Sequence, residues 1–109
     1  MKFEDNGTSA VLDLHRTRVD DTARWVNNAV RLCSEYGRTS LKIIHGTSTS
    51  ETAFRNRTIK HALYDLLDAG TFRTQIHQVL KSDSFAVLIF SNMGTKPKPA
   101  RINPFDVFR

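Results

Sequence analysis

Two short, mainly apolar stretches each end in a histidine. In residues 9–15, every second side chain from Ala10 onward is apolar, and Asp13 and His15 fall on the opposite face. This alternation predicts a strand, because successive side chains of a strand point to opposite faces. Residues 41–45, Leu-Lys-Ile-Ile-His, form a second predicted strand. Both histidines would then lie at the carboxyl ends of their strands.

A helical pattern separates these two strands. Apolar residues from Ala23 onward recur at the spacing of an amphipathic helix, which indicates a helix buried along much of one side. Thr17 followed by Asp20 is close to a capping box at its start. Gly37 is typical of a helix end. A strand, a helix and a strand in this order predict a βαβ unit with a right-handed crossover.

A second helix is predicted after a polar loop at residues 46–56. Asn56 suits the N-cap position, and Gly70 suits the end of the helix. Its core stripe would consist of Ile59, Ala62, Leu63, Leu66 and Leu67.

The segment after this helix fits two patterns. Residues 71–80 match a helical period and, almost as well, a strand. Residues 85–90, Phe-Ala-Val-Leu-Ile-Phe, are the clearest strand of the chain, and the polar residues 81–84 before them resemble a hairpin connection. The hairpin favours a strand for the ambiguous segment.

The element order β-α-β-α-β-β predicts the α/β class in the form of an α+β two-layer sandwich. We expect a four-stranded mixed sheet with two helices on one face. The domain should span residues 9–94, with terminal extensions at 1–8 and 95–109. Residues 1–8 are polar and expected to be frayed, whereas Phe105 and Phe108 are candidates to pack on the open face of the sheet.

Composition narrows the function classes. The 109 residues carry 16 Lys plus Arg against 11 Asp plus Glu, a net charge of +5, which suggests a polyanion partner. A basic but otherwise ordinary soluble surface is the alternative. Cys33 is the only cysteine, so a disulfide framework is excluded. With no signal-like or membrane-spanning stretch, we expect a reducing, cytoplasmic setting and no membrane partner.

The two histidine-ended strands define one candidate site if they are parallel neighbours. Asp13 could then orient the imidazole of His15 or hold it protonated, and His45 would lie beside them. Alternatively, Asp13 satisfies backbone donors at a turn and His15 is a half-buried polar residue, which spacing alone favours. A divalent metal, Mg or Mn, could be held by these three side chains, although nothing in their spacing demands a metal.

The residues after His45 have the chemistry of a phosphate-binding loop. Gly46 allows close approach of a phosphate, Thr47 and Ser48 offer hydroxyl groups, and the backbone N–H groups from Gly46 to Ser48 are expected to bind the phosphate. No Walker lysine follows, which excludes a P-loop of the NTPase type. A mobile serine-rich loop is the alternative.

Cations cluster near the carboxyl ends of the two histidine-ended strands, which would form one rim of the predicted sheet. Arg55, Arg57 and Lys60 stand at the start of the second helix, where the helix dipole disfavours positive charge. Phosphate contact would explain this conflict, and a solvated charged face is the alternative. Arg16, Arg18 and Arg24 could extend the basic patch around the rim.

With these motifs in place, the chain resembles the Smr (small MutS-related) domain. The likeness rests on residues 12–15 (Leu-Asp-Leu-His), 44–46 (Ile-His-Gly) and the helical stripe at 59–67, in that order, and covers roughly residues 11–90. The chain departs from the family pattern at Arg16 and Ser48, where glycine is usual, and in the polar residues 81–84 before the last strand.

The resemblance implies a fold like the C-terminal domain of translation initiation factor 3, and nucleic-acid binding, often with nicking of DNA or cleavage of RNA. By position, Asp13 and His15 match the family motif linked to cleavage. Residues 45–46 match the second family motif, which ends the second strand. Our main hypothesis is an endonuclease with His15 as general acid or base, steadied by Asp13, and His45 as its partner.

Two further hypotheses remain. The altered glycines favour a non-catalytic DNA- or RNA-binding module. A protein-interaction domain could instead dock another protein, or a larger parent chain, through Phe105, Val107 and Phe108.

Overall fold

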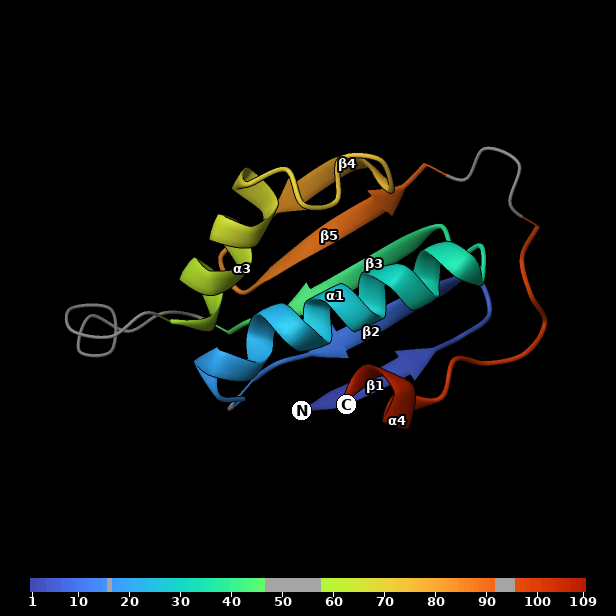
Figure 1. Cartoon of the computed structure of the whole chain (residues 1–109), viewed down its shortest axis with the longest axis horizontal. Coiled ribbons are helices and arrows are strands. Elements are labelled where there is room, and N and C mark those ends of the chain that lie inside the picture. Colours follow the sequence, from blue (N-terminus) through green and yellow to red (C-terminus); the bar gives the residue numbers. More distant parts are fainter. Residues whose placement is uncertain (16, 47–57, 92–95) are drawn as a thin grey trace.

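A sheet and a layer of helices make up the structure, a computed structural model that describes residues 1–15, 17–46, 58–91 and 96–109 (Figure 1). The described strands form one five-stranded sheet in the order β1-β2-β3-β5-β4. They are β1 (Lys2–Asp5), β2 (Ser9–Asp13), β3 (Ser40–Ile44), β4 (Ile76–Lys81) and β5 (Phe85–Phe90). β2 and β3 pair in parallel, and the other three pairs are antiparallel.

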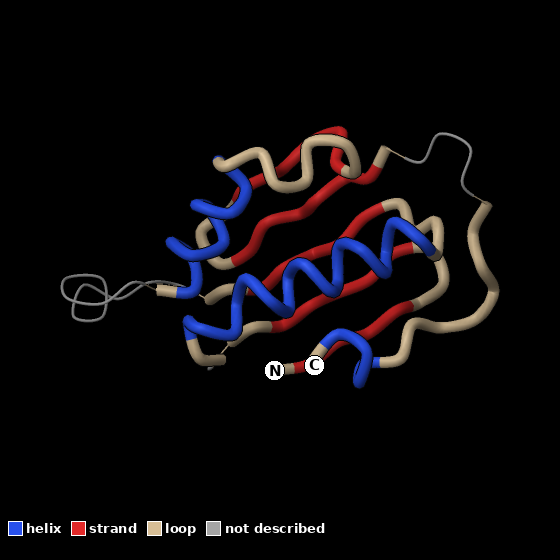
Figure 2. The backbone as a smooth tube through the Cα atoms, in the orientation of Figure 1, coloured by secondary structure: helices blue, strands red, loops and turns tan. Residues whose placement is uncertain are grey.

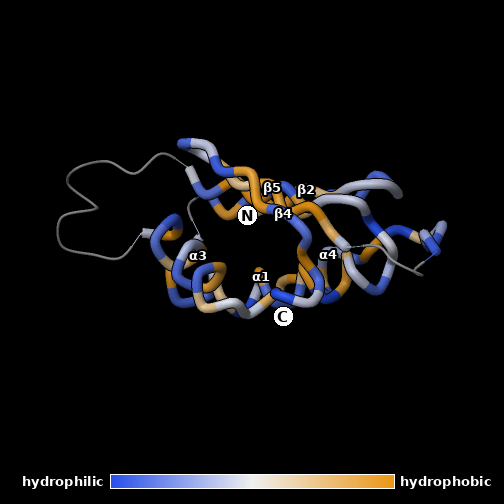
Figure 3. The backbone as a smooth tube through the Cα atoms, turned by 90° about the horizontal axis from the view of Figure 1, so that it is seen from above, coloured by the Kyte–Doolittle hydropathy of each residue, from blue (hydrophilic) through white to orange (hydrophobic). Residues whose placement is uncertain are grey.

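In the described part of the chain, three helices cover one face of this sheet. α1 (Val19–Glu35) connects β2 to β3, α3 (Ile59–Asp68) follows β3, and α4 (Pro104–Val107) lies near the end of the chain (Figure 2). Figure 3 shows all three on the same side of the sheet. The mixed α+β class is therefore confirmed.

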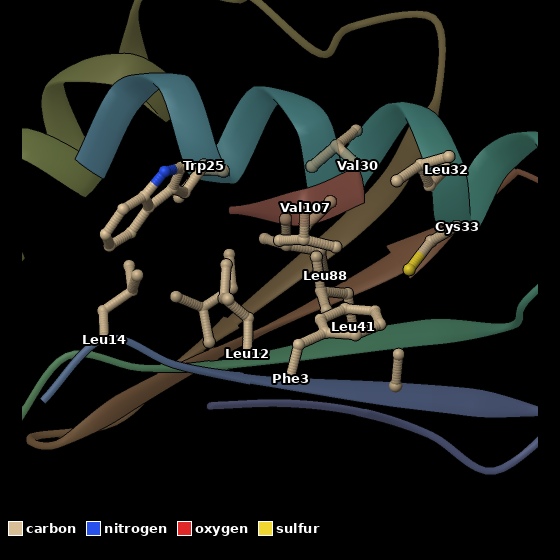
Figure 4. Close-up of a cluster of buried hydrophobic side chains, with 14 of the residues drawn as sticks. Phe3, Leu12, Leu14, Trp25, Val30, Leu32, Cys33, Leu41, Leu88 and Val107 are labelled. Atoms are coloured by element: carbon tan, nitrogen blue, oxygen red, sulfur yellow. The ribbon is translucent and has the colours of Figure 1, made fainter. Parts of the chain in front are cut away.

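The core lies between the sheet and α1. Leu12 of β2, Leu41 of β3 and Leu88 of β5 are fully buried below Val30 of α1 (Figure 4). Val107 of α4 is also fully buried in this cluster. The alternation of buried and half-buried residues along the central strands explains why their sequence pattern was readable.

The predicted strand number is wrong, because residues 1–8 are not frayed. β1 pairs with β2 in antiparallel register, and Phe3, opposite Leu12, is only 4% exposed. A four-residue strand with one apolar side chain carries almost no periodic signal by itself. It becomes stable through pairing and through the burial of that single ring.

The placement predicted for the terminal aromatic rings is also wrong. The ring of Phe108 packs edge-on against Trp25 of α1, with 5.1 Å between the ring centroids, on the helix side of the sheet. Phe105 is 83% exposed and Val107 is buried. The three residues therefore do not form a common docking surface, and a partner for the tail stays a prediction.

Two predicted helix starts differ from the structure. Arg18 is the N-cap of α1 and makes no side-chain cap hydrogen bond, so the Thr17–Asp20 capping box is wrong. Thr58, rather than Asn56, caps α3, and its hydroxyl accepts a hydrogen bond from the His61 N–H. The other predicted signals are confirmed: the helix ends before Gly37, which has a φ of +70°, and β4 and β5 form an antiparallel hairpin.

A buried ion pair ties both ends of the chain to the sheet. The guanidinium of Arg38 donates to both carboxylate oxygens of Asp5 at 2.7 Å, and both side chains are almost completely buried. The same guanidinium donates to the carbonyls of Tyr36, Lys98 and Ala100. The segment before α4 is thereby fixed against β1 and the α1–β3 connection.

Candidate functional site

The two histidine motifs meet at one rim of the sheet. β2 and β3 are parallel neighbours, and the pairing continues past Asp13, because the Leu14 N–H donates to the Ile44 carbonyl at 2.8 Å. A Cβ added to Gly46 would lie 3.4 Å from Cδ2 of His15, so the His15 ring lies close to the last residue of the second motif. The predicted adjacency of the two strand ends is therefore confirmed.

Asp13 holds the turn that carries His15. Its Oδ1 accepts a hydrogen bond from the backbone N–H of His15 at 2.8 Å. Among the described residues, no hydrogen bond joins this carboxylate to an imidazole ring. Asp13 therefore acts on His15 through the backbone, and the His15 side chain itself is exposed.

His45 is the buried member of the pair, with 6% of its surface exposed. Its Nδ1 lies 2.7 Å from the Gly46 carbonyl, which makes Nδ1–H the donor and leaves Nε2 as a bare acceptor. Nε2 is buried and has no hydrogen-bond partner within the described part of the chain. Burial lowers the pKa of His45; the Gly46 carbonyl opposes this shift and the charge of Lys60 adds to it. The ring is therefore neutral at pH 7.

Tyr64 of α3 packs against His45 and was not recognised from the sequence. The two rings meet edge to face, with centroids 5.6 Å apart and an interplanar angle of 83°. The ammonium groups of Lys60 and Lys81 lie 5.8 and 4.7 Å from the centroid of the tyrosine ring. Burial and the nearby Asp83 raise the pKa of the tyrosine hydroxyl. The spacing of Lys60 and Tyr64, one helical turn apart, was the available sequence signal.

The β4–β5 hairpin completes the rim and changes the expected role of the glycine. The Ser84 carbonyl accepts hydrogen bonds from the N–H groups of both His45 and Gly46 at 3.0 Å. The Gly46 N–H is therefore already paired, and the expectation that it binds phosphate is wrong for this atom. The φ of Gly46 is +80°, a conformation that side chains with a Cβ rarely adopt.

The predicted basic patch is described only in part. Lys60 lies at the rim, and Arg18 is exposed at the start of α1. Arg24 is paired with Asp21 at 2.7 Å. The remaining predicted contacts lie outside the described residues: Arg16, Thr47, Ser48, Arg55 and Arg57.

Neither a metal centre nor a membrane segment is found in the described part of the chain. Residues 1–15, 17–46, 58–91 and 96–109 contain no group of three or more His, Cys, Asp or Glu side chains that could hold a metal ion. None of the described helices combines the length and the apolar character that a membrane crossing requires.

These features define a two-layer α+β domain with paired histidine motifs at the carboxyl ends of two parallel strands. The sequence model of the Smr domain matches residues 12–94, most of the 109-residue chain. The chain belongs to the Smr domain family. No curated protein and no solved structure matches it.

Proposed function

We propose that this Smr domain cleaves phosphodiester bonds of DNA or RNA at the rim formed by β2 and β3. The observation that carries the proposal is the meeting of the two motifs at one rim, where the exposed His15 ring lies close to Gly46, the residue that follows the buried His45. Proton transfer to and from oxygen needs two such groups, one that accepts and one that donates. The family resemblance supports the same activity.

The different environments of the two imidazoles suggest a division of roles. Binding of the strand would open Nε2 of His45, which is buried in the free domain, to the attacking water or hydroxyl, and its lone pair would take the proton as the oxygen bonds to phosphorus. The exposed His15 would give a proton to the leaving oxygen as the P–O bond breaks. Asp13 is a positioning residue that keeps the turn of His15 in place. The ammonium group of Lys60 offsets the charge that develops on the phosphate.

The test is cleavage of end-labelled single- and double-stranded DNA and RNA, with and without a chelator. We expect His15→Ala and His45→Ala to lower the rate by roughly 10²–10⁴-fold, the range supplied by general acid–base catalysis. His77→Ala is the matched control, because this exposed histidine lies on β4 away from the rim. The proposal is refuted if folded His15→Ala protein cuts as fast as the parent.

A non-catalytic nucleic-acid-binding module is the second candidate. It is favoured by the pairing of the His45 and Gly46 N–H groups with Ser84, which removes two donors that could stabilise a transition state. This candidate predicts binding that weakens steeply with added salt, and no cleavage with any divalent ion tested.

A further inference from the structure

Lys60, Tyr64 and Lys81 form a compact cluster beside His45, referred to here as the Tyr64 cluster. Its members come from α3 and from the end of β4, and they surround one ring. The charge of Lys60 also acts on His45, so the cluster lies next to the proposed catalytic residues at the rim.

The ammonium groups of both lysines lie against the ring of Tyr64. Among the described residues, neither ammonium group has a carboxylate within salt-bridge distance. A cation held near a ring face loses less freedom when it then meets an anion, because its side chain is already ordered. The arrangement therefore suits a ligand that brings negative charge to this spot.

The surface on the other side of the rim, at the start of α1, is less favourable for an anion. The first turn of α1 carries Asp20 and Asp21, and the guanidinium of Arg24 is already paired with Asp21. Arg18 is exposed at the start of α1 as well, but Asp20 and Asp21 follow it there, whereas Lys60 and Lys81 flank Tyr64 on the side of α3 and the β4–β5 hairpin. Asp83 in that hairpin opposes this positive charge, because it acts on the Tyr64 hydroxyl.

We propose that the Tyr64 cluster binds a second phosphate of the nucleic-acid strand, next to the one held at His15 and His45. The strand would leave the rim across Tyr64 and pass the β4–β5 hairpin, not the start of α1. This inference rests on the proposed function for the identity of the ligand. It adds Lys81 and Tyr64 as binding residues and gives the strand a path.

The experiment measures binding of an end-labelled single-stranded RNA, and of its DNA counterpart, by fluorescence anisotropy over a series of salt concentrations. A gel checks that each oligonucleotide stays intact. Because each phosphate contact contributes about 0.7 to the salt slope for a single strand, Lys81→Gln and Lys60→Gln should each lower the slope by that amount. Each should also weaken binding several-fold at low salt.

The chain offers a matched control at the other end of the sheet. The ammonium group of Lys98 lies 4.9 Å from the ring centroid of Tyr36, much as Lys81 lies beside Tyr64. Lys98→Gln removes the same charge from a similar ring contact and should leave the slope unchanged. Asp83→Asn should tighten binding, because it removes the opposing charge.

The outcomes separate this inference from the proposed catalysis. If the parent binds and cleaves but Lys81→Gln and Lys60→Gln behave like Lys98→Gln, the second phosphate site is wrong and the catalytic rim stands. If both variants bind more weakly and no protein cleaves, the site holds and the catalytic proposal fails. If the parent binds neither oligonucleotide, both are overturned.

Discussion

Replacing Asp5 by asparagine keeps the shape of the side chain and removes its charge from the interior. Each carboxylate oxygen accepts two hydrogen bonds: Oδ1 from Arg38 and the Gly7 N–H, Oδ2 from Arg38 and the Ile102 N–H. An amide group in place of either oxygen would face two donors with two further donors. The change also leaves the buried guanidinium of Arg38 without its counter-ion.

The expected loss in the free energy of unfolding is about 3–5 kcal/mol, the range for breaking one partner of a buried ion pair. A domain of this size is stable by roughly 5–15 kcal/mol in total, so the variant should lose a large part of its stability. Urea denaturation followed by the fluorescence of Trp25, the only tryptophan, measures this loss. A loss below about 1 kcal/mol would refute the reasoning.

The neighbouring Glu4 is the control for charge removal. Its ion pair with Lys2 lies on the surface, with 65% and 69% of the two side chains exposed. Glu4→Gln should therefore unfold at the same urea concentration as the parent.

The pH dependence of unfolding tests the same pair. Burial raises the pKa of Asp5, but the hydrogen bonds from Arg38, Ile102 and Gly7 outweigh it and hold the pKa below its ordinary value. The folded protein thus binds this proton less readily than the unfolded chain. Its contribution to stability is complete above about pH 4 and is lost as the pH falls through the lower folded pKa. Asp5→Asn should lack this part of the acid destabilisation.

Three further predictions concern the rim and the tail. Gly46→Ala should lower stability by about 1–2 kcal/mol in urea denaturation because of the positive φ, and equal stability would contradict the assigned backbone. Lys60→Gln should raise the pKa of His45 toward its ordinary value in an NMR titration, whereas an unchanged pKa would show that the charge of Lys60 does not reach the ring. Val107→Ala should lower the thermal midpoint and Phe105→Ala should not, because only the former is buried; equal midpoints would argue against the packed tail.

The sequence pattern was sufficient for the elements that bury one regular face. β2, α1, β3 and β5 each place apolar residues at the period of their own structure. β1 could not be found in this way, because Phe3 is its one apolar side chain and its stability comes from β2 and the C-terminal segment. The burial of Ile102 and Val107 likewise depends on the path of the chain after β5.

The candidate site could also be predicted only in part from the sequence. Adjacent strand ends follow from a βαβ unit, so the meeting of His15 and His45 at one rim could be inferred from order alone. Two features of the site could not be inferred in this way. They are the hydrogen bond from the Gly46 N–H to the Ser84 carbonyl and the packing of Tyr64 on His45. Both depend on where the β4–β5 hairpin and α3 settle, which is decided by tertiary packing.

The ion pair between Asp5 and Arg38 has a kinetic consequence. During synthesis these two residues exist long before Ala100 and Ile102, which complete their hydrogen bonding from up to 97 positions away. Closing such long loops is slow, so the segment that carries Ala100 and Ile102 should dock after the unit from β1 to β3 has formed. Substitutions at Asp5 should therefore accelerate unfolding while leaving the folding rate nearly unchanged.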